Sequence, residues 1–350
     1  MDFTFDETQQ AVANLAATVL RHDAEHARVE NVLASDAGYD ETLWKALAQA
    51  GLLSLALPAS LGGEGLGAVE VAAVLTEVGR QTVPLPALAT LALGVLPVVA
   101  SGNESVQRSL LPEVADGRVL TAALRDAHGT VTSASRDGSE LRGVKVGVPF
   151  AAQAHRMLVA TEAGVVVVDA QGDGVALTRT PTSTHAPEYT VRLDGARGEL
   201  LTPDTSMLTR CAVVGAAAVA DGVLAGALAL TAAHVRDREQ FGKPLATFQA
   251  VAERVADVYV VARAMNLAAV SAAWRLAAGL DADDDLHIAA YWLAAEVPPA
   301  LQTCHHLHGG LGVDVTYPLH RYYSHGKDLA RLVGGADAGL ERIGVRCSSS

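Results

Sequence analysis

Residues 238–244 read Arg-Glu-Gln-Phe-Gly-Lys-Pro and stand between two long segments rich in alanine, leucine and valine. These segments predict helices over about Met207 to Arg238 and about Phe248 to Ala278. A glycine followed by Lys243-Pro244 ends a helix, and a terminal arginine offsets the negative end of the helix dipole. Taken alone, the stretch predicts an ordinary helix end and a turn.

The chain beyond this turn is also predicted to be helical, to about Ile343. The acidic run Asp281 to Asp285 predicts a solvated loop with an N-cap. Pro298-Pro299 should kink or restart the next helix. That helix leads into a second unusual stretch, in which residues 306–312 read His-Leu-His-Gly-Gly-Leu-Gly.

A different pattern precedes the helical half, from about Val119 to Leu201. Short runs rich in β-branched residues, such as Arg156 to Ala160 and Val165 to Val168, are separated by Gly, Asp, Ser and Pro. The run Tyr189 to Leu193 alternates between apolar and polar residues, which predicts a strand with one solvated face. This part of the chain is therefore expected to form a small β domain.

The first hundred or so residues return to the helical pattern. Thr4 and Glu7 suggest a capping box for the first helix. A second helix is expected from near Asp40 to Gly51, and a third over Val69 to Gly79. The glycine-rich residues 58–67 lack the Gly-Lys-Ser/Thr ending of a phosphate loop, so they predict a turn. The expected fold is α+β, with an N-terminal helical domain (residues 1–117), a central β domain (118–203) and a C-terminal helical domain (204–350).

Composition limits the function classes. The formal net charge of −13 argues against a nucleic-acid partner, which would need clustered basic residues. The longest candidate for a membrane span, from about Leu85 to Val99, is shorter than the ~20 residues that a span needs. The acidic residues 1–7 do not resemble a signal peptide. A cytoplasmic protein with no membrane association is expected. The cysteines number three and predict reduced thiols.

The two unusual stretches, taken in order and within helical segments, resemble the C-terminal domain of the acyl-CoA dehydrogenase family. The helical, β, helical layout extends that resemblance over essentially the whole chain. In the family, the position of Arg238 and that of Gln240 contact the pyrophosphate of FAD held by a neighbouring subunit, and Gln249 reaches toward the adenosine. The resemblance implies an FAD site made of Arg238, Gln240, Phe241, Gln249, His306, Leu307, His308, Gly309 and Gly310.

Histidine spacing in the second stretch raised a metal site as an alternative. His305, His306 and His308 place at most two rings on one helical face, with no carboxylate or thiolate motif beside them. No metal is therefore predicted. The family usually has glutamine at the position of His306, and imidazole can still donate a hydrogen bond to a phosphate.

The catalytic glutamate of the family has no counterpart here. The segment that carries it in most members corresponds to residues 332–336, where Gly334 stands in its place. The alternative location, on the long helix before the first motif, falls near Ala212. The family's flavin-facing strand, Gly-Thr-Lys-x-Trp-Ile-Thr, corresponds to residues 143–149 and has Gly147 and Pro149 at two flavin contacts. The preceding loop, residues 125–128, lacks the usual threonine.

This combination resembles the shorter, base-lacking subunit of bacterial α2β2 acyl-CoA dehydrogenases of steroid side-chain degradation, such as the type acting on 3-oxo-4-pregnene-20-carboxyl-CoA. The resemblance implies a longer partner subunit that carries the catalytic glutamate, shared FAD, an acyl-CoA substrate and electron-transfer flavoprotein as acceptor. Two alternatives stay open. One is a flavin-free scaffold with the same fold, and the other is a homomeric dehydrogenase whose base has moved to Glu341 or Glu296.

Overall fold

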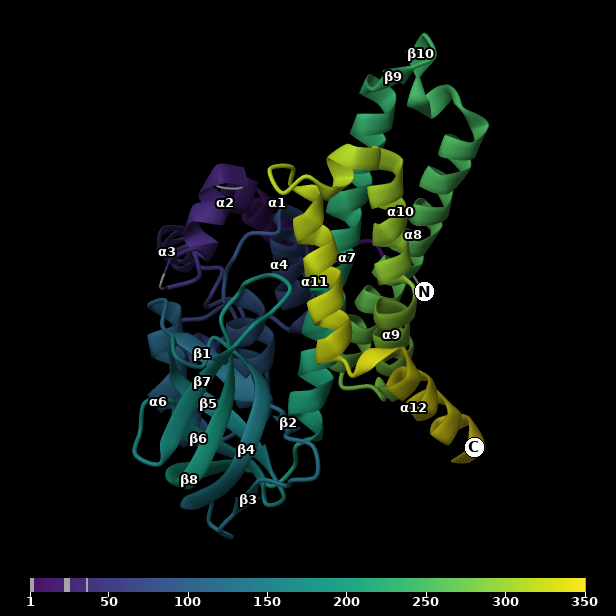
Figure 1. Ribbon diagram of the computed structural model, residues 1–350. Helices are drawn as coiled ribbons and strands as arrows, with labels where there is room; N and C mark the ends of the chain where they lie inside the picture. Colours follow the sequence, from purple (N-terminus) through teal and green to yellow (C-terminus); the bar gives the residue numbers. More distant parts are fainter. Residues whose placement is uncertain (1–2, 22–25, 36, 350) are drawn as a thin grey trace.

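The computed structural model describes residues 3–21, 26–35 and 37–349, so residues 1 and 2 of the acidic start lie outside it. Helices come first, then a β-sheet, then a C-terminal helical bundle (Figure 1). The α+β fold predicted from the sequence is confirmed. The domain limits expected at residues 117/118 and 203/204 fall in the connections that join the sheet to the helices on either side.

The N-terminal helices pack around buried leucines and valines. Side chains cap the starts of two of these helices. The second predicted helix starts near Asp40, as expected. The side chain of Asp40 accepts a hydrogen bond of 2.9 Å from the backbone N–H of Leu43, so Asp40 is its N-cap. The capping box of the first helix was predicted wrongly, because Asp6 and Gln9 form it reciprocally. The elements are α1 (Glu7–Arg21), α2 (His26–Leu33), α3 (Glu41–Gln49), η1 (Ala59–Leu61), α4 (Ala68–Gln81), the π-helix η2 (Leu88–Val95), α5 (Leu96–Ala100) and α6 (Glu104–Ala115).

The sheet comes from the middle of the chain and orders its strands as β1-β5-β6-β8-β4-β2. Strand β1 runs parallel to β5, and the other pairings are antiparallel. The long strand β8 alternates between buried and solvated residues at its start, as its sequence predicted. The strands are β1 (Val119–Ala123), β2 (Arg125–Asp126), β3 (Ser133–Ala134), β4 (Glu140–Pro149), β5 (Ala154–Thr161), β6 (Gly164–Asp169), β7 (Val175–Thr180) and β8 (Glu188–Thr202).

The C-terminal bundle contains the longest helices, and Figure 1 shows the β9–β10 hairpin projecting from one end of it. Pro298 and Pro299 lie in the first turn of α10, so they restart the helix as predicted. The elements are α7 (Ser206–Asp237), β9 (Glu239–Gln240), β10 (Lys243–Pro244), η3 (Leu245–Thr247), α8 (Gln249–Ala277), α9 (Asp283–Ala295), α10 (Val297–His308), η4 (Gly309–Val313), α11 (Leu319–Leu332) and α12 (Gly335–Ser349).

One acidic segment was assigned wrongly. The predicted loop over residues 281–285 is instead partly helical, since α9 begins at Asp283. The preceding residue, Ala282, is the N-cap and offers no side-chain cap. Acidic side chains in a first turn favour a helix because they face its positive end.

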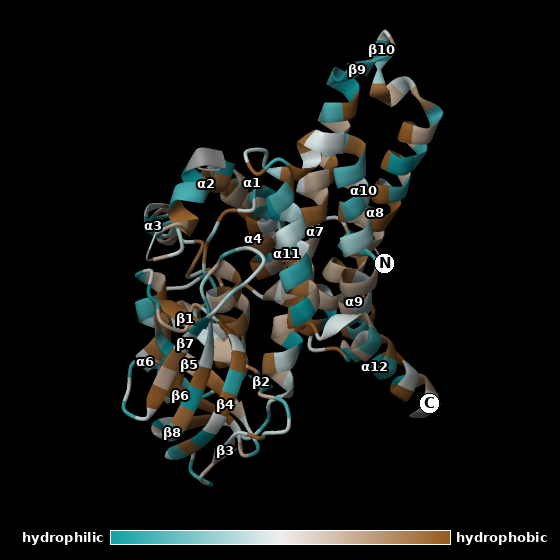
Figure 2. Cartoon of the chain, viewed as in Figure 1, coloured by the Kyte–Doolittle hydropathy of each residue, from teal (hydrophilic) through white to brown (hydrophobic). Residues whose placement is uncertain are grey.

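Helix α7 is the core of the bundle and packs along α4. Two glycines set this close approach, because a Cβ at Gly222 would lie 1.8 Å from the Thr76 carbonyl oxygen. A Cβ at Gly79 would lie 2.2 Å from the carbonyl oxygen of Val219. Figure 2 shows the apolar colouring concentrated in the helices and strands of the interior.

By length and composition, α7 and α8 are apolar enough to cross a membrane, so the prediction of Leu85 to Val99 as the longest candidate span was wrong. Helix α7 has 78% of its apolar window buried inside the protein, as expected for a core helix. Helix α8 has only 28% buried, so much of its apolar surface faces outward.

Candidate functional site

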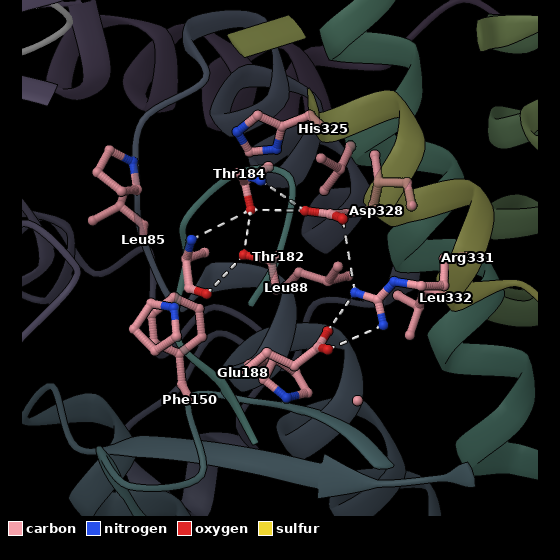
Figure 3. Close-up of a pocket in the computed structure, with 18 of the residues that line it drawn as sticks. Leu85, Leu88, Phe150, Thr182, Thr184, Glu188, His325, Asp328, Arg331 and Leu332 are labelled. Atoms are coloured by element: carbon pink, nitrogen blue, oxygen red, sulfur yellow. Dashed lines mark hydrogen bonds and ion pairs between the residues drawn. The ribbon is translucent and has the colours of Figure 1, made fainter. Parts of the chain in front are cut away.

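A cavity of about 140 Å³ lies where the N-terminal helices, the sheet and the bundle meet. Its apolar side includes Leu85, Leu88 and Phe150, and α11 closes the opposite side (Figure 3). The volume is below the ~300 Å³ at which pockets for drug-sized ligands begin. Charged side chains occupy the part of the cavity between the sheet and α11.

The central contact joins Arg331, near the end of α11, to Glu188, the first residue of β8. Arg331 donates from Nη1 to Glu188 Oε1 at 3.0 Å and from Nη2 to Oε2 at 2.6 Å (Figure 3). These hydrogen bonds to Glu188 raise the pKa of Arg331. The guanidinium of Arg125 completes the cluster by donating to the backbone carbonyl of Arg331 at 2.7 Å. Burial, and then the charge of Arg331, lower the pKa of Arg125.

The second carboxylate of the cavity, that of Asp328, holds the loop between β7 and β8. It accepts hydrogen bonds from the backbone N–H groups of Ser183 at 3.2 Å and Thr184 at 3.0 Å, and from the Thr184 hydroxyl at 2.9 Å. Both carboxylates that line the cavity are therefore engaged by the protein itself. A carboxylate held in this way is a poor general base, because taking up a proton would break those bonds.

Neither position expected for the family's catalytic glutamate supplies a carboxylate. Gly334 follows α11 with a φ of 95°, and Ala212 is buried in α7. Glu341 and Glu296, the candidates for a relocated base, do not line the cavity. The carboxylates that do line it, Glu188 and Asp328, were missed in the sequence. No local pattern could have found the Glu188 pair, since 143 positions separate it from Arg331.

The residues that face this cavity do not fit a flavin ring. Gly147 has a φ of 69°, and a Cβ there would lie 2.5 Å from Nη2 of Arg125 and 3.4 Å from Nη1 of Arg331. A tryptophan at this position, as in the family's strand, would collide with both guanidinium groups. Pro149 offers no backbone N–H to a ligand.

The first sequence motif lies at the other end of the bundle, in the β9–β10 hairpin. Arg238, Gln240 and Phe241 are exposed there, and the ring of Phe241 is 91% exposed. Phe241 has a φ of 55°, which is uncommon for an aromatic residue. Gln249 is exposed at the start of α8 and donates to Glu253 Oε1 at 2.9 Å. The hairpin thus presents a cation, an amide and an aromatic ring to whatever lies beside it.

A pair of stacked histidines joins the second motif to the helix that precedes the first motif. The rings of His234, one turn before Arg238, and His308 are stacked with centroids 4.3 Å apart. Nδ1 of His308 lies 2.8 Å from the Cys304 carbonyl oxygen, and Nε2 lies 3.3 Å from the Tyr317 hydroxyl. Burial lowers the pKa of both stacked histidines, so neutral rings are favoured.

The remaining residues of the second motif differ in exposure. Leu307 and His308 are buried. His306, Gly309 and Gly310 are exposed. Gly309 has a φ of 59°, and a Cβ on either glycine would meet nothing within 4 Å. The two glycines therefore leave open space in which a ligand could approach the backbone closely. Among the described residues, no group of three or more His, Cys, Asp or Glu side chains could hold a metal ion.

Comparison with known proteins places this geometry in context. The chain matches the N-terminal domain of acyl-CoA dehydrogenases over residues 6–118 and their C-terminal domain over residues 207–346. Acyl-CoA dehydrogenase FadE28 of Mycobacterium tuberculosis is 46% identical, and the alignment covers 99% of each chain.

Two solved structures are also similar. A chain from a variant of the Tcur3481–Tcur3483 steroid acyl-CoA dehydrogenase is 36% identical, with a TM-score of 0.91 over 98% of this chain and 99% of that one. A chain from the ChsE4–ChsE5 complex of Mycobacterium tuberculosis is 32% identical, with a TM-score of 0.93 over the full length of both chains.

Proposed function

The chain belongs to the acyl-CoA dehydrogenase family, and we propose that it is the subunit without a catalytic base in a heteromeric, FAD-dependent enzyme. The enzyme would introduce an α,β double bond into a steroid side-chain CoA thioester, in the cytoplasm. A longer partner subunit would carry the catalytic glutamate, in an α2β2 assembly. The single observation that carries the proposal is the Glu188–Arg331 pair in the cavity where an active site would need open space.

The contents of this cavity argue against catalysis by this chain. Removing the α proton of a thioester needs a carboxylate that is free to accept it. Glu188 and Asp328 are both engaged, and the positions of Gly334 and Ala212 carry no acid. Loss of a general base typically costs ~10²–10⁴-fold in rate. The base must then come from another chain.

The opposite end of the bundle fits a role in holding a partner's cofactor. The exposed guanidinium of Arg238 and the amide of Gln240 suit the oxygens of a diphosphate. Phe241, Gln249 and His306 would lie beside the same ligand, and the backbone of residues 307–310 would approach it. When bound, FAD would supply the hydride acceptor for the reaction. This chain would bind and orient that cofactor, and its residues would take no proton.

Assembly with another chain is supported by the outward apolar surface of α8. Tyr259 and Val260 are 60% and 63% exposed, and Trp274 is 38% exposed. Rows of large exposed apolar residues mark interaction surfaces. The similar solved structures include one described as a steroid acyl-CoA dehydrogenase and one described as a complex, which supports a heteromer and a steroid substrate. Electron-transfer flavoprotein is the acceptor we propose.

Expression of the chain alone and together with a longer dehydrogenase subunit tests the proposal. We expect little bound flavin in the chain alone, and flavin with turnover of a steroid acyl-CoA in the pair. Activity of the chain alone would contradict the proposal and favour a base within it. A stable complex of the two subunits that contains no flavin would instead favour the alternative of a flavin-free scaffold with the same fold.

A further inference from the structure

Arg321, in the first turn of α11, is a buried cation with unmet hydrogen-bond donors in the described part of the chain. The residue is 7% exposed, and its Nε and Nη1 are buried with no partner in the part of the chain that the structure describes. Buried charges in proteins are normally paired or hydrogen-bonded, because removing an ion from water is costly. The unmet donors of Arg321 therefore point to a group that the isolated chain lacks.

The side chain lines a second cavity, which we name the Arg321 cavity. Its volume is about 190 Å³, and it lies between α2, the loop of residues 183–186 and the start of α11. The volume exceeds the ~30 Å³ that one water molecule takes in the liquid, so a small ligand has room. Thr184 and His325 line this cavity and also the first one, at the end away from the Glu188–Arg331 pair (Figure 3).

The other polar groups of the cavity are compatible with an anion. Ser183 and Ser324 line it, and their hydroxyls make no hydrogen bond within the described residues. Burial lowers the pKa of His325 to about 4, so its ring is neutral near pH 7 and can donate from one nitrogen. His320 lies at the cavity too, with Nδ1 2.8 Å from the Tyr317 carbonyl oxygen.

Glu30 of α2 is the acid that lines this cavity, and it is the competing partner for Arg321. Its side chain is 47% exposed and lies 3.7 Å from Nε2 of His320. Burial lowers the pKa of Arg321, while the charges of Tyr322 and then of Glu30 act in the opposite direction. Among the described residues, no hydrogen bond joins Glu30 to Arg321. Glu30 thus lies at the rim, while the guanidinium lies inside.

We propose that the Arg321 cavity binds a small oxyanion, a carboxylate or a phosphate, through the unmet N–H donors of Arg321. The planar guanidinium matches the geometry of both anions, and hydrogen bonds between charged groups are about twice as strong as neutral ones. The hydroxyls of Ser183 and Ser324 and the ring of His325 would complete the contacts. This site is separate from the hairpin and from the Glu188–Arg331 pair, so it does not depend on the proposed function.

Titration calorimetry of the full chain tests the site. Sodium acetate and inorganic phosphate are titrated separately. The anion that binds at a single saturable site shows whether the ligand is a carboxylate or a phosphate. We expect Arg321→Gln to weaken that binding roughly tenfold or more, as for a lost charged hydrogen bond. Arg321→Lys should weaken it less. Arg108→Gln, which removes an exposed arginine of α6, should leave it unchanged and controls for net charge.

Glu30→Gln separates the two explanations of the buried charge. If an anion fills the cavity, removal of the nearby carboxylate should strengthen anion binding and leave the melting temperature close to that of the wild type. If Glu30 is the true counter-ion, Glu30→Gln should lower the melting temperature and leave no anion binding. That second result overturns the proposal, as does the absence of saturable binding to the wild type or equal binding to Arg321→Gln.

Discussion

Glu188 and Arg331 lie 143 positions apart in the chain, yet hydrogen bonds of 3.0 Å and 2.6 Å join them across the boundary between the sheet and the bundle. The pair links β8 to the end of α11, and Arg125 adds a third contact to the same helix end. The cluster therefore lines the charged side of the cavity and also ties two parts of the fold together.

Glu188→Gln should reduce the free energy of unfolding by about 1 kcal/mol, since the pair is bidentate but Arg331 is 41% exposed to screening water. Urea unfolding measures the change. Glu104→Gln is the control, because it breaks an exposed pair with Arg108 on a single helix and should have almost no effect. Equal effects of the two substitutions would mean that the Glu188 contact contributes little.

Gly147→Ala should destabilise the chain by roughly 2–4 kcal/mol. Positive φ costs a residue with a Cβ about 1–2 kcal/mol. The new Cβ would also displace the guanidinium of Arg125 and break its hydrogen bond to the Arg331 carbonyl, at a further cost of about 1–2 kcal/mol. Gly129→Ala is the matched control, because Gly129 has a φ of 73° with nothing within 4 Å of its Cβ position. Equal losses at both positions in urea unfolding would show that space beside Gly147 is not limiting.

Arg238→Ala in the co-expressed pair should raise the dissociation constant of FAD about tenfold or more, the effect of losing a charged hydrogen bond. Flavin fluorescence on dilution measures it. Arg236→Ala is the control, since Arg236 is an exposed arginine two residues before Arg238 and pairs with Asp237. Unchanged FAD affinity in Arg238→Ala would contradict the proposed cofactor contact.

His308→Ala and His306→Ala should differ sharply although the residues are two apart. Loss of His308 removes the stack on His234 and the contact with Tyr317 from a buried position, at a cost of about 2–3 kcal/mol. His306 is exposed, so its loss should change the unfolding free energy by less than about 0.5 kcal/mol. Thermal unfolding compares them, and similar melting temperatures would argue against a structural role for His308.

Asp221→Asn should stabilise the chain at neutral pH. Burial in α7 raises the pKa of Asp221 to about 6, despite a hydrogen bond of 3.1 Å from the Asn266 amide. Because the folded state then binds the proton more tightly than the unfolded state, stability falls as pH rises from about 4 to 6 and stays lower above it. The gain from Asp221→Asn should be about 2–3 kcal/mol at pH 7.5 and should shrink toward pH 4.

Urea unfolding at several pH values measures this dependence. Asp237→Asn is a suitable control, because Asp237 is exposed at the end of the same helix. If the stability gained through Asp221→Asn did not change with pH, ionisation of the Asp221 carboxyl would not be what destabilises the folded chain.

The long helices and the sheet could be predicted because their information is local. Periodic apolar residues placed α7 and α8 within a residue or two of their observed ends, and Asp40 marked a helix start through its own side chain. Prediction from the local sequence was wrong at the starts of two helices. Asp6 rather than Thr4 caps α1, and α9 begins at Asp283, inside an acidic run.

The contents of the central cavity could be predicted only in part. Missing groups, such as the carboxylate absent at Gly334, are visible in the sequence once a pattern is available for comparison. The charged groups that line the cavity cannot be predicted in this way, because Arg125, Glu188 and Arg331 come from three distant segments. The unmet donors of Arg321 are likewise a property of packing, and no sequence pattern reports them.

The exposed ring of Phe241 has a consequence for how the protein must be made. In the proposed assembly a neighbouring chain covers this ring, but an orphan chain would leave it in water at the tip of the hairpin, together with the apolar side of α8. Such surfaces promote aggregation. Cells would therefore need to synthesise the two polypeptides in matched amounts, and surplus copies of this one would be expected to precipitate or to be degraded.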